Sequence, residues 1–554
     1  MKRTNIALLS FIVCCSVMPV LSKAQDTTKR KSIDITSTFK PVLREAAKIN
    51  FNAAPPAVDT SKPRMSYSIP VQNLFFTYQP AELKPMALEM DSITAWQYSN
   101  FIKVGIGNVH QPYVKAGFSF GDFKNTFFNV FADHYTSKGS LDFQKNSMTS
   151  VGAAMTYKTN NNLEVNARLG FKSDDYYLYG YEPKTLVFDK KDLRQRFQTI
   201  EGRVDLRNIE PTEFGLNYHP NLKISSFGDN HSVKGKETNT VLNLPLEKTF
   251  GEDFAFQLGA TADLTRYERE ENTALSMPSL KQSNNLYMVN AALQYKSDNL
   301  FIQGGIIPSW DQKNFHMLPN IMADITTNDK QFTLQLGWLG YYEKGSYQRF
   351  ASINPWLAQP DSMYNTRIEE RFAGLKGSVG NHFSYSAKFS LLTLRNQPLF
   401  VNDDIDGKTF LIHYEPKFNA IRLHTEAAYN VGEQFGAKAG FTFSNYYNMK
   451  VEKKAWGMIP VELNAGLHWQ AMKDLMLRTE FWLWDGARYL RGGDDYKNKA
   501  GFDLNAGAEF RITRNLNLWV QFNNILNNKY QRWNQYEVFG FNLLGGITYS
   551  FNQK

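Results

Sequence analysis

A single stretch of this chain has the spacing of a hydrolase nucleophile. Gly117, Ser119 and Gly121 form the pattern Gly-x-Ser-x-Gly. In hydrolases that pattern exposes a serine on a sharp turn between a strand and a helix. Here the residues after Gly121 lead into a second alternating segment, so we interpret Ser119 as a strand residue before a tight turn. The pattern therefore does not predict an enzyme.

The histidines and the acidic pairs could in principle bind metals. Nine histidines are spread singly along the chain, without the spacing of zinc ligands. We expect His424 and His468 to line a water-filled interior beside carboxylates. The stretch 491–495 carries two aspartates but supplies too few ligands for a defined calcium loop, which favours a solvated external loop. We predict no catalytic, cofactor-binding or metal-binding residues, and no cofactor.

Three tryptophans are the remaining candidates for a binding platform. Trp482, Trp484 and Trp519 could stack on sugar rings. Interfacial girdles and packing inside a barrel explain most tryptophans of barrel proteins, and we favour that interpretation. The elements that position all these residues therefore decide what they do.

The first 24 residues have the pattern of a cleaved secretory signal. A basic start precedes an apolar core over 6–21 and a small-residue cleavage site before Gln25. The alternative, a membrane anchor, is disfavoured because the apolar run is short for a span. Cys14 and Cys15 lie inside the signal, so the expected mature chain has no cysteine and no disulfide or thiol chemistry.

Composition narrows the class of protein further. Aromatic residues make up 14% of the chain although its mean hydropathy is −0.43, which excludes both a helical membrane protein and a disordered chain. Without the three basic residues of the signal, 59 basic residues face 53 acidic ones, a net charge of +6. These charges are scattered rather than clustered, so no nucleic-acid partner is predicted.

Period-two alternation is the decisive structural signal. Across 502–512 the even positions are apolar and the odd positions are mostly polar or charged, so Leu504 and Phe510 would face lipid and Asn505 a lumen. A turn at 513–515 and a second alternating segment complete a hairpin. Ten or so such hairpins follow one another, and open strand edges cannot be satisfied in hydrocarbon. A closed barrel is therefore expected.

Turn lengths alternate as well. Longer connections such as Gly486–Lys499 and Gln359–Thr366 separate the short turns, and bacterial barrels combine short periplasmic turns with long external loops. The short polar turns fall at Gly121-Asp122, Asn160–Asn162, Gly251–Asp253, Ser297–Asn299, Asn328–Lys330, Asn381-His382, Gly432–Gln434, Lys473-Asp474 and Arg514-Asn515. We predict an all-β, transmembrane antiparallel β-barrel of about 22 strands over 101–554, with 16 to 20 as the alternative because 400–418 reads as loop-rich.

The closing segments resemble a known family. Residues 520–530 and 540–551 are similar to the last strands of TonB-dependent receptor barrels, and 101–121 resembles the barrel entry of a shorter, Bacteroidota-type group. Phe39–Val42 with Ala47–Asn50 resembles the N-terminal signature of that group. The resemblance implies an outer-membrane barrel of a Gram-negative bacterium. It also implies that the strand ending at Phe551 engages the outer-membrane assembly machinery.

The segment 25–100 departs from that family, because it is too short for a standard plug domain. Ile33–Thr36 could pass for a TonB box, but the many prolines favour an extended periplasmic tail. A barrel of this size has a wide lumen that others of its kind plug. We hypothesise that the tail enters the lumen or pairs with a periplasmic partner.

Two functions remain open from the sequence. The family resemblance implies transport or ligand reception across the outer membrane. The alternative is a structural or complex-forming barrel subunit whose tail binds a periplasmic partner, without active transport. In both cases we expect membrane lipid and a periplasmic or lipoprotein partner, and no enzyme activity.

Overall fold

The computed structural model describes residues 100–122, 124–230, 233–271 and 278–552. The chain divides into two units, Met1–Pro70 and Val71–Lys554, and every described residue belongs to the second. The expected signal peptide and all but the last residue of the expected segment 25–100 therefore lie outside the described residues.

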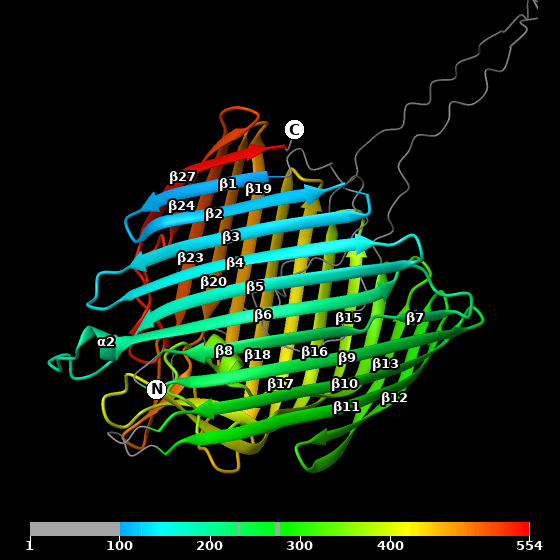
Figure 1. Ribbon diagram of the computed structural model, residues 1–554, viewed down its shortest axis with the longest axis horizontal. Helices are drawn as coiled ribbons and strands as arrows, with labels where there is room; N and C mark the ends of the chain where they lie inside the picture. Colours follow the sequence, from blue (N-terminus) through cyan, green and yellow to red (C-terminus); the bar gives the residue numbers. More distant parts are fainter. Residues whose placement is uncertain (1–99, 123, 231–232, 272–277, 553–554) are drawn as a thin grey trace, which may run out of the picture. The chain divides into compact units, whose positions relative to one another are not determined.

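The described chain forms one ring of antiparallel strands (Figure 1). The sheet has 23 strand segments, and β7 and β8 form one wall strand because both pair with β9, which gives 22. The first half of the wall consists of β1(Asn100–Gly107), β2(His110–Gly121), β3(Thr126–Lys138), β4(Lys145–Lys158), β5(Leu163–Tyr177), β6(Arg194–Asn208), β7(Leu216–Tyr218), β8(Asn221–Asp229), β9(Gly235–Phe250), β10(Phe254–Arg269), β11(Leu280–Lys296) and β12(Leu300–Asp311).

The second half of the wall continues the same up-and-down order. It consists of β13(Asn314–Thr326), β14(Phe332–Glu343), β15(Thr366–Val379), β16(Phe383–Asn402), β17(Phe410–Val431), β18(Phe435–Tyr447), β19(Val461–Met472), β20(Leu475–Trp484), β23(Gly501–Arg511), β24(Leu516–Asn523) and β27(Asn542–Phe551). Outside the wall lie two short hairpins, β21(Arg488–Arg491) with β22(Asp494–Lys497) and β25(Gln531–Trp533) with β26(Tyr536–Glu537), and two helices, α2(Lys190–Leu193) and α3(Tyr347–Ile353).

The first and last wall strands close the ring. β1 pairs with β27 in antiparallel register from Asn100↔Phe551 to Gly107↔Leu544. The two backbones approach closely at this seam, because a Cβ on Gly546 would lie 1.9 Å from the carbonyl oxygen of Val104. The predicted closed antiparallel barrel of about 22 strands is confirmed, and closure leaves the wall without a free edge.

The two ends of the barrel differ. All nine predicted short turns join strands at one end, which we call the turn end, and β1 enters and β27 leaves there too. A tenth connection at this end, 209–215 between β6 and β7, was not predicted. The longer connections, including 344–365 and 485–500, lie at the opposite end, the loop end. By the bacterial pattern the turn end faces the periplasm.

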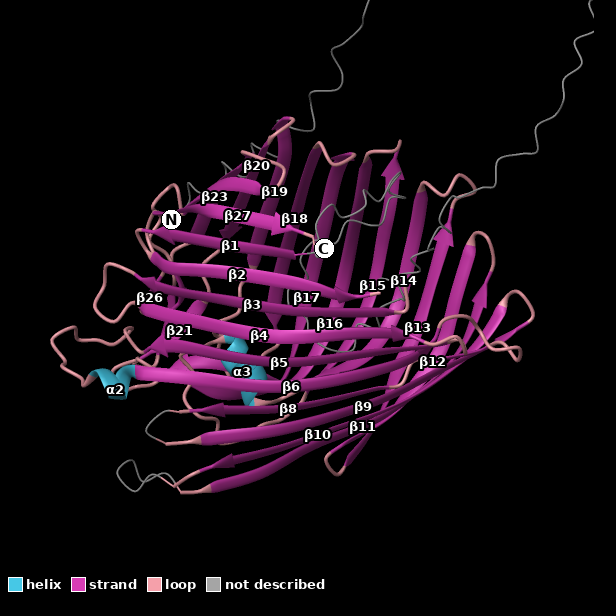
Figure 2. Cartoon of the chain, turned by 45° about the horizontal axis from the view of Figure 1, so that its top comes forward, coloured by secondary structure: helices cyan, strands magenta, loops and turns pink. Residues whose placement is uncertain are grey.

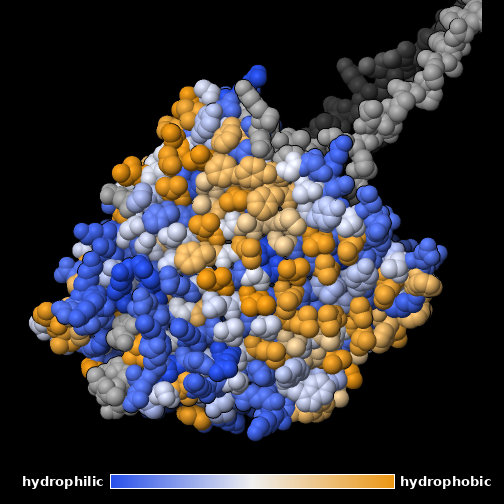
Figure 3. Space-filling view, in the orientation of Figure 1, coloured by the Kyte–Doolittle hydropathy of each residue, from blue (hydrophilic) through white to orange (hydrophobic). Residues whose placement is uncertain are grey.

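The two faces of the wall lie as the alternation predicts. Phe510 is 49% exposed on the outside, whereas Asn505 points inward and its side-chain oxygen accepts a hydrogen bond from the Asn524 backbone at 2.9 Å. Figure 3 shows apolar side chains spread over the outer face of the front strands, with polar ones gathered toward the end that carries α2. Among the described residues, no helix is long and apolar enough to cross a membrane.

One expectation about the wall is wrong. Residues 400–418 are mostly strand, because β16 runs to Asn402, β17 starts at Phe410, and only 403–409 form a loop. Alternation fails here because both faces of β16 are covered. Leu399 and Val401 pack with Trp456 in one buried cluster, while Phe400 belongs to another.

The face assignment predicts opposite outcomes for two neighbouring substitutions. Leu504→Arg places a charge against lipid and should cost roughly 2–4 kcal/mol, so less folded barrel accumulates. Asn505→Arg loses one hydrogen bond, worth about 1 kcal/mol, but its charge reaches the lumen. The fraction that migrates fast on unheated gels measures folding in both variants. Equal losses would show that the faces are assigned wrongly.

Candidate functional site

The connection between β14 and β15, residues 344–365, folds into the barrel at the loop end. The Ser346 side chain caps α3 by accepting a hydrogen bond from the Arg349 backbone. Tyr347 and Phe350 on this short helix are fully buried. Figure 2 draws α3 behind β5 and β6, inside the ring of strands.

Around α3 lies a large aromatic cluster, which we call the aromatic cap. Its members come from external loops and from the inward faces of wall strands at many positions around the ring. They are Tyr179, Phe197, Phe227, Tyr267, Tyr347, Phe350, Ala351, Leu357, Met363, Phe400, Phe410, Trp533 and Tyr536, with Trp356 and five other partly buried residues packed against them.

The cap crosses the lumen from one side of the wall to the other. Tyr536, on the connection between β24 and β27, stacks on Trp356 with ring centroids 3.9 Å apart. It also meets Tyr179, which follows β5, at 4.9 Å. On the same hairpin Trp533 contacts Phe410 of β17 at 5.4 Å. Because these elements stand far apart in the ring, their contact places packed side chains across the loop end.

Buried carboxylates anchor α3 beneath the cap. The Glu237 carboxylate accepts hydrogen bonds from the backbone of Tyr347 at 2.6 Å and of Gln348 at 3.3 Å. The Asp229 carboxylate accepts from the Tyr347 hydroxyl and, at 2.8 Å, from the Gln359 amide. Burial and the Asp229 charge raise the pKa of Tyr347, so this phenol stays a donor. Four hydrogen bonds to these two buried side chains thus hold α3 and Gln359 in place.

An ion pair holds the start of the same loop. The Lys344 ammonium lies 3.0 Å from the Asp263 carboxylate and donates to the Asp263 carbonyl at 3.2 Å, and both side chains are buried. Burial lowers the pKa of Lys344, and the Asp263 charge opposes that shift. Removing one partner of a buried pair typically costs about 3–5 kcal/mol. The loop therefore has one preferred position.

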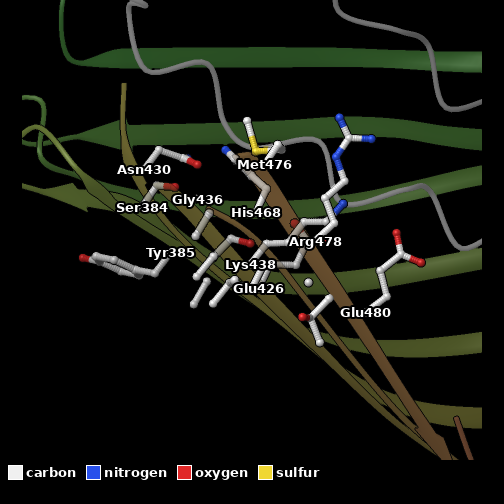
Figure 4. A pocket seen from close by; sticks show the side chains of 17 residues that line it. Ser384, Tyr385, Glu426, Asn430, Gly436, Lys438, His468, Met476, Arg478 and Glu480 are labelled. Carbon is white, nitrogen blue, oxygen red and sulfur yellow. The ribbon is translucent and has the colours of Figure 1, made fainter. Parts of the chain in front are cut away.

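A second feature is a cavity of about 420 Å³ on the inner wall near the turn end, which we call the turn-end pocket (Figure 4). Its charged side chains project from neighbouring strands into the lumen, close to the short turns that join those strands. They are Glu426 on β17, Lys438 on β18, His468 on β19, and Arg478 and Glu480 on β20.

Glycines and strand register shape this pocket. His468 lies directly opposite Arg478 on β20 and opposite Gly436 on β18. A Cβ on Gly436 would come within 2.0 Å of the imidazole, so glycine there makes room for the ring. Lys438 is opposite Gly466, diagonal to His468. Two cationic side chains and an imidazole thus converge on one patch of the wall.

The structure places the candidate serine and histidines in barrel strands. Ser119 lies in β2, and its hydroxyl donates to the Asn129 side chain at 2.7 Å. The chain then turns into β3, so the strand-to-helix context of a hydrolase elbow does not form. His424 contacts the Glu426 carboxylate at 3.0 Å, as expected, and His468 lines the turn-end pocket. No cluster of three metal-ligating side chains occurs among the described residues.

The predicted tryptophans and external loop lie as follows. Trp519 is buried in the lumen, with the Lys103 ammonium 4.3 Å from its ring centroid, and Trp484 meets Tyr530 edge to face at 4.7 Å. Both contacts are packing inside the barrel. Residues 491–495 lie at the tip of the β21–β22 hairpin, where Gly492 and Gly493 form the turn and have positive φ.

Sequence reasoning missed the two features that matter most. The aromatic cap draws on residues of external loops, where alternation is absent, although the dense aromatics of 176–181 and 347–356 were a signal that these loops pack. The turn-end pocket needs strand register, which brings together residues from five strands. The alternation of apolar and polar residues shows which face of a strand a side chain lies on. It does not show which residues of the neighbouring strands lie beside that side chain.

Comparison with solved structures shows what this barrel resembles. It is similar to the ferripyoverdine receptor of the outer membrane of Pseudomonas aeruginosa, with a TM-score of 0.61 and 11% identity over 83% of this chain and 72% of that one. It is similar to the FrpB iron transporter from Neisseria meningitidis, with a TM-score of 0.64 and 9% identity over 82% and 81%. It is also similar to the siderophore receptor PirA from Acinetobacter baumannii, with a TM-score of 0.61 and 8% identity over 82% of this chain and 80% of that one.

At these identities the likeness is one of fold. No protein-family model matches the chain, and no curated protein matches it in sequence. The expected resemblance to receptor barrels is confirmed at this coarser level, and this chain has the barrel fold of outer-membrane siderophore receptors.

The anchors of α3 predict graded effects on the cap. Tyr347→Ala removes a fully buried ring and should cost about 3–5 kcal/mol, so trypsin should cut the loop at Lys344 or Arg349 in folded protein. Tyr347→Phe removes only the hydroxyl and should have a smaller effect. Ile353→Ala, on the exposed side of α3, is the matched control. Equal cleavage of all variants would contradict the packing described.

Proposed function

We propose that this protein is an outer-membrane barrel for transport or ligand reception whose outer mouth is closed by the aromatic cap. The observation that carries the proposal is the cap across the lumen of a 22-strand barrel. The fold shared with an iron transporter and siderophore receptors supports the outer-membrane location and the general role. The substrate is not part of the proposal.

Passage in this scheme depends on movement of the loop 344–365. The lumen behind the cap is lined with polar and charged side chains suited to a hydrated path. The anchors of the loop are hydrogen bonds and three ion pairs, Lys344–Asp263, Arg349–Glu343 and Arg269–Asp361, which can be broken and remade. The wall strands, in contrast, cannot part in lipid. The cap is therefore the element we assign to gating. We propose no enzyme activity, because Ser119 lacks the context of a nucleophile.

The cap also favours a second function. A barrel whose outer mouth is closed at rest could serve as a structural or complex-forming subunit, with a periplasmic or lipoprotein partner and no active transport. The two functions differ in one measurable respect. A gated path opens when the cap is loosened, whereas a purely structural barrel need not conduct.

The stacked rings that cross the lumen provide the test of gating. Trp356→Ala with Tyr536→Ala removes the contact at 3.9 Å and should raise ion conductance in planar bilayers and uptake of large antibiotics by cells. The matched control is Tyr489→Ala with Tyr496→Ala, a stacked pair on the external β21–β22 hairpin that lies outside the cap. Because residues 25–99 could also occlude the lumen, all variants are repeated with residues 30–95 deleted. Unchanged conductance in both backgrounds would contradict gating.

Copurification tests the second function. Deleting residues 30–95 while keeping the signal should remove a periplasmic protein that copurifies with the full chain from native membranes, if the tail binds a partner. The cap variants should retain that protein, because the cap lies at the loop end, whereas the chain enters β1 at the turn end. A full chain that purifies alone would exclude a stable complex.

A further inference from the structure

Three cations form a row across neighbouring strands on the outer face of the wall, at the loop end. Arg367 on β15 lies directly opposite Arg395 on β16, and Arg395 lies directly opposite Lys417 on β17. The neighbours of these residues in sequence, including Ile368 and Leu394, are buried together on the inner face. Successive side chains of a strand point to opposite faces, so the three cations point outward. We call them the cation row.

The cation row has little negative charge beside it. None of the ion pairs among the described residues includes a member of the row. Of the carboxylates nearby, Glu415 is buried and accepts hydrogen bonds from the backbone of residues 450–452 at 2.6–3.3 Å. Asp311, which interacts electrostatically with the row, accepts a hydrogen bond from the Asn365 amide at 2.7 Å. Glu369 is the carboxylate that remains on the same face of β15.

The lack of counterions is unfavourable for the barrel alone. Like charges that lie directly opposite each other on adjacent strands destabilise a sheet, and here two such pairs share Arg395. An anionic group bound to the row removes this repulsion. The height of the row on the wall indicates which anion that is.

The row lies just above the part of the wall that faces hydrocarbon. Phe383, Phe389 and Leu391 on β16 are exposed on the outer face between the turn end and the row. Arg395 is twelve positions beyond Phe383, which is about 40 Å along the strand. With a strand tilt of 35–45° this is a height of roughly 30 Å, whereas the apolar band of such barrels is about 25 Å tall. The row therefore lies at the level of lipid headgroups on the external side.

A neighbouring cation and tryptophan mark the same boundary. Arg371 is exposed on the outer face of β15, four positions from Arg367 toward the turn end. Its guanidinium lies 5.2 Å from the ring centroid of Trp338 on β14, which is itself 40% exposed. Tryptophans of membrane proteins are enriched at the interface between hydrocarbon and water.

We propose that the cation row binds the phosphate groups of a lipid in the external leaflet of the membrane. Guanidinium groups bind phosphate through paired, charge-assisted hydrogen bonds. The row spans two strand spacings, about 10 Å, so a single headgroup can contact all three cations. The exposed side chains of Leu391 and Phe389 below the row provide the surface for the acyl chains. This inference uses the outer-membrane location but not the gating of the proposed function.

Thermal unfolding of the mature barrel in an uncharged detergent tests the proposal. Lipid A that carries its phosphates is added to the micelles, and the temperature at which fast migration on gels is lost is measured. We expect lipid A to raise this temperature, because a ligand that binds only the folded barrel stabilises it. Lipid A whose phosphates have been removed should produce a rise several times smaller.

Removing the cation row separates lipid binding from a purely structural role. Arg367→Gln with Arg395→Gln and Lys417→Gln should reduce the rise with lipid A severalfold. Without lipid this variant should be at least as stable as the wild type, because the repulsion between opposite cations is gone. If the triple variant does not fold, Arg395→Gln alone removes the centre of the row.

The matched control removes the same charge elsewhere at the loop end. Lys138→Gln with Lys190→Gln and Lys191→Gln changes three exposed cations on β3 and α2 and should keep the full rise. An absent rise for the wild type, equal rises for the row variant and the control, or an undiminished rise with dephosphorylated lipid A would overturn the proposal. The same rise with inorganic phosphate alone would also overturn it, since the occupant would then be a free anion. None of these outcomes bears on conductance, so failure here is distinguishable from failure of the gating proposal.

Discussion

Every other feature of this protein depends on the pairing of β1 with β27. In hydrocarbon an unpaired backbone N–H or C=O group costs several kcal/mol, so a sheet of amphipathic strands is tolerated only when its two edges meet. Pairing from Asn100↔Phe551 to Gly107↔Leu544 satisfies the backbone groups of both edges. Closure also creates the aqueous interior in which charged side chains such as Glu426 and Arg478 can point inward. The polar lumen, the cap and the pocket are consequences of a closed ring.

The cap shows how a wide ring is filled at one end. A barrel of 22 strands is too wide for its own wall side chains to meet across the lumen. Here a connecting loop turns inward and brings rings such as Tyr347 and Trp356 against aromatics of the wall. The carboxylates of Glu237 and Asp229 satisfy the polar groups that this loop buries. Packing supplies stability, and the polar anchors fix the position of the loop.

Most of the wall could be predicted from the sequence, and most of the interior could not. Alternation around Leu504 and Phe510 reports which face meets lipid, because lipid and water impose opposite demands on neighbouring residues. At residues 399–401 neighbouring side chains do not differ in this way, because protein covers both faces of the strand. The apolar–polar alternation is therefore absent, and the sequence was interpreted as loop. The pocket around His468 depends on cross-strand register, which a single strand does not encode. The Gly-x-Ser-x-Gly motif at Ser119 was rejected because an alternating segment, not a helix, follows it in the sequence. The structure agrees, since β2 turns directly into strand β3.

The pairing of β1 with β27 also determines when the barrel can close during its biogenesis. Its second strand, β27, occupies Asn542–Phe551 and is synthesised after all the other wall strands. Until those residues emerge, β1 has no partner on one side, and a partial sheet would expose backbone groups that lipid cannot satisfy. The ring therefore cannot close before β27 has been made, and insertion of a complete wall has to wait for that strand. A nascent chain interrupted before β27 is an open sheet, whatever the quality of the strands before it.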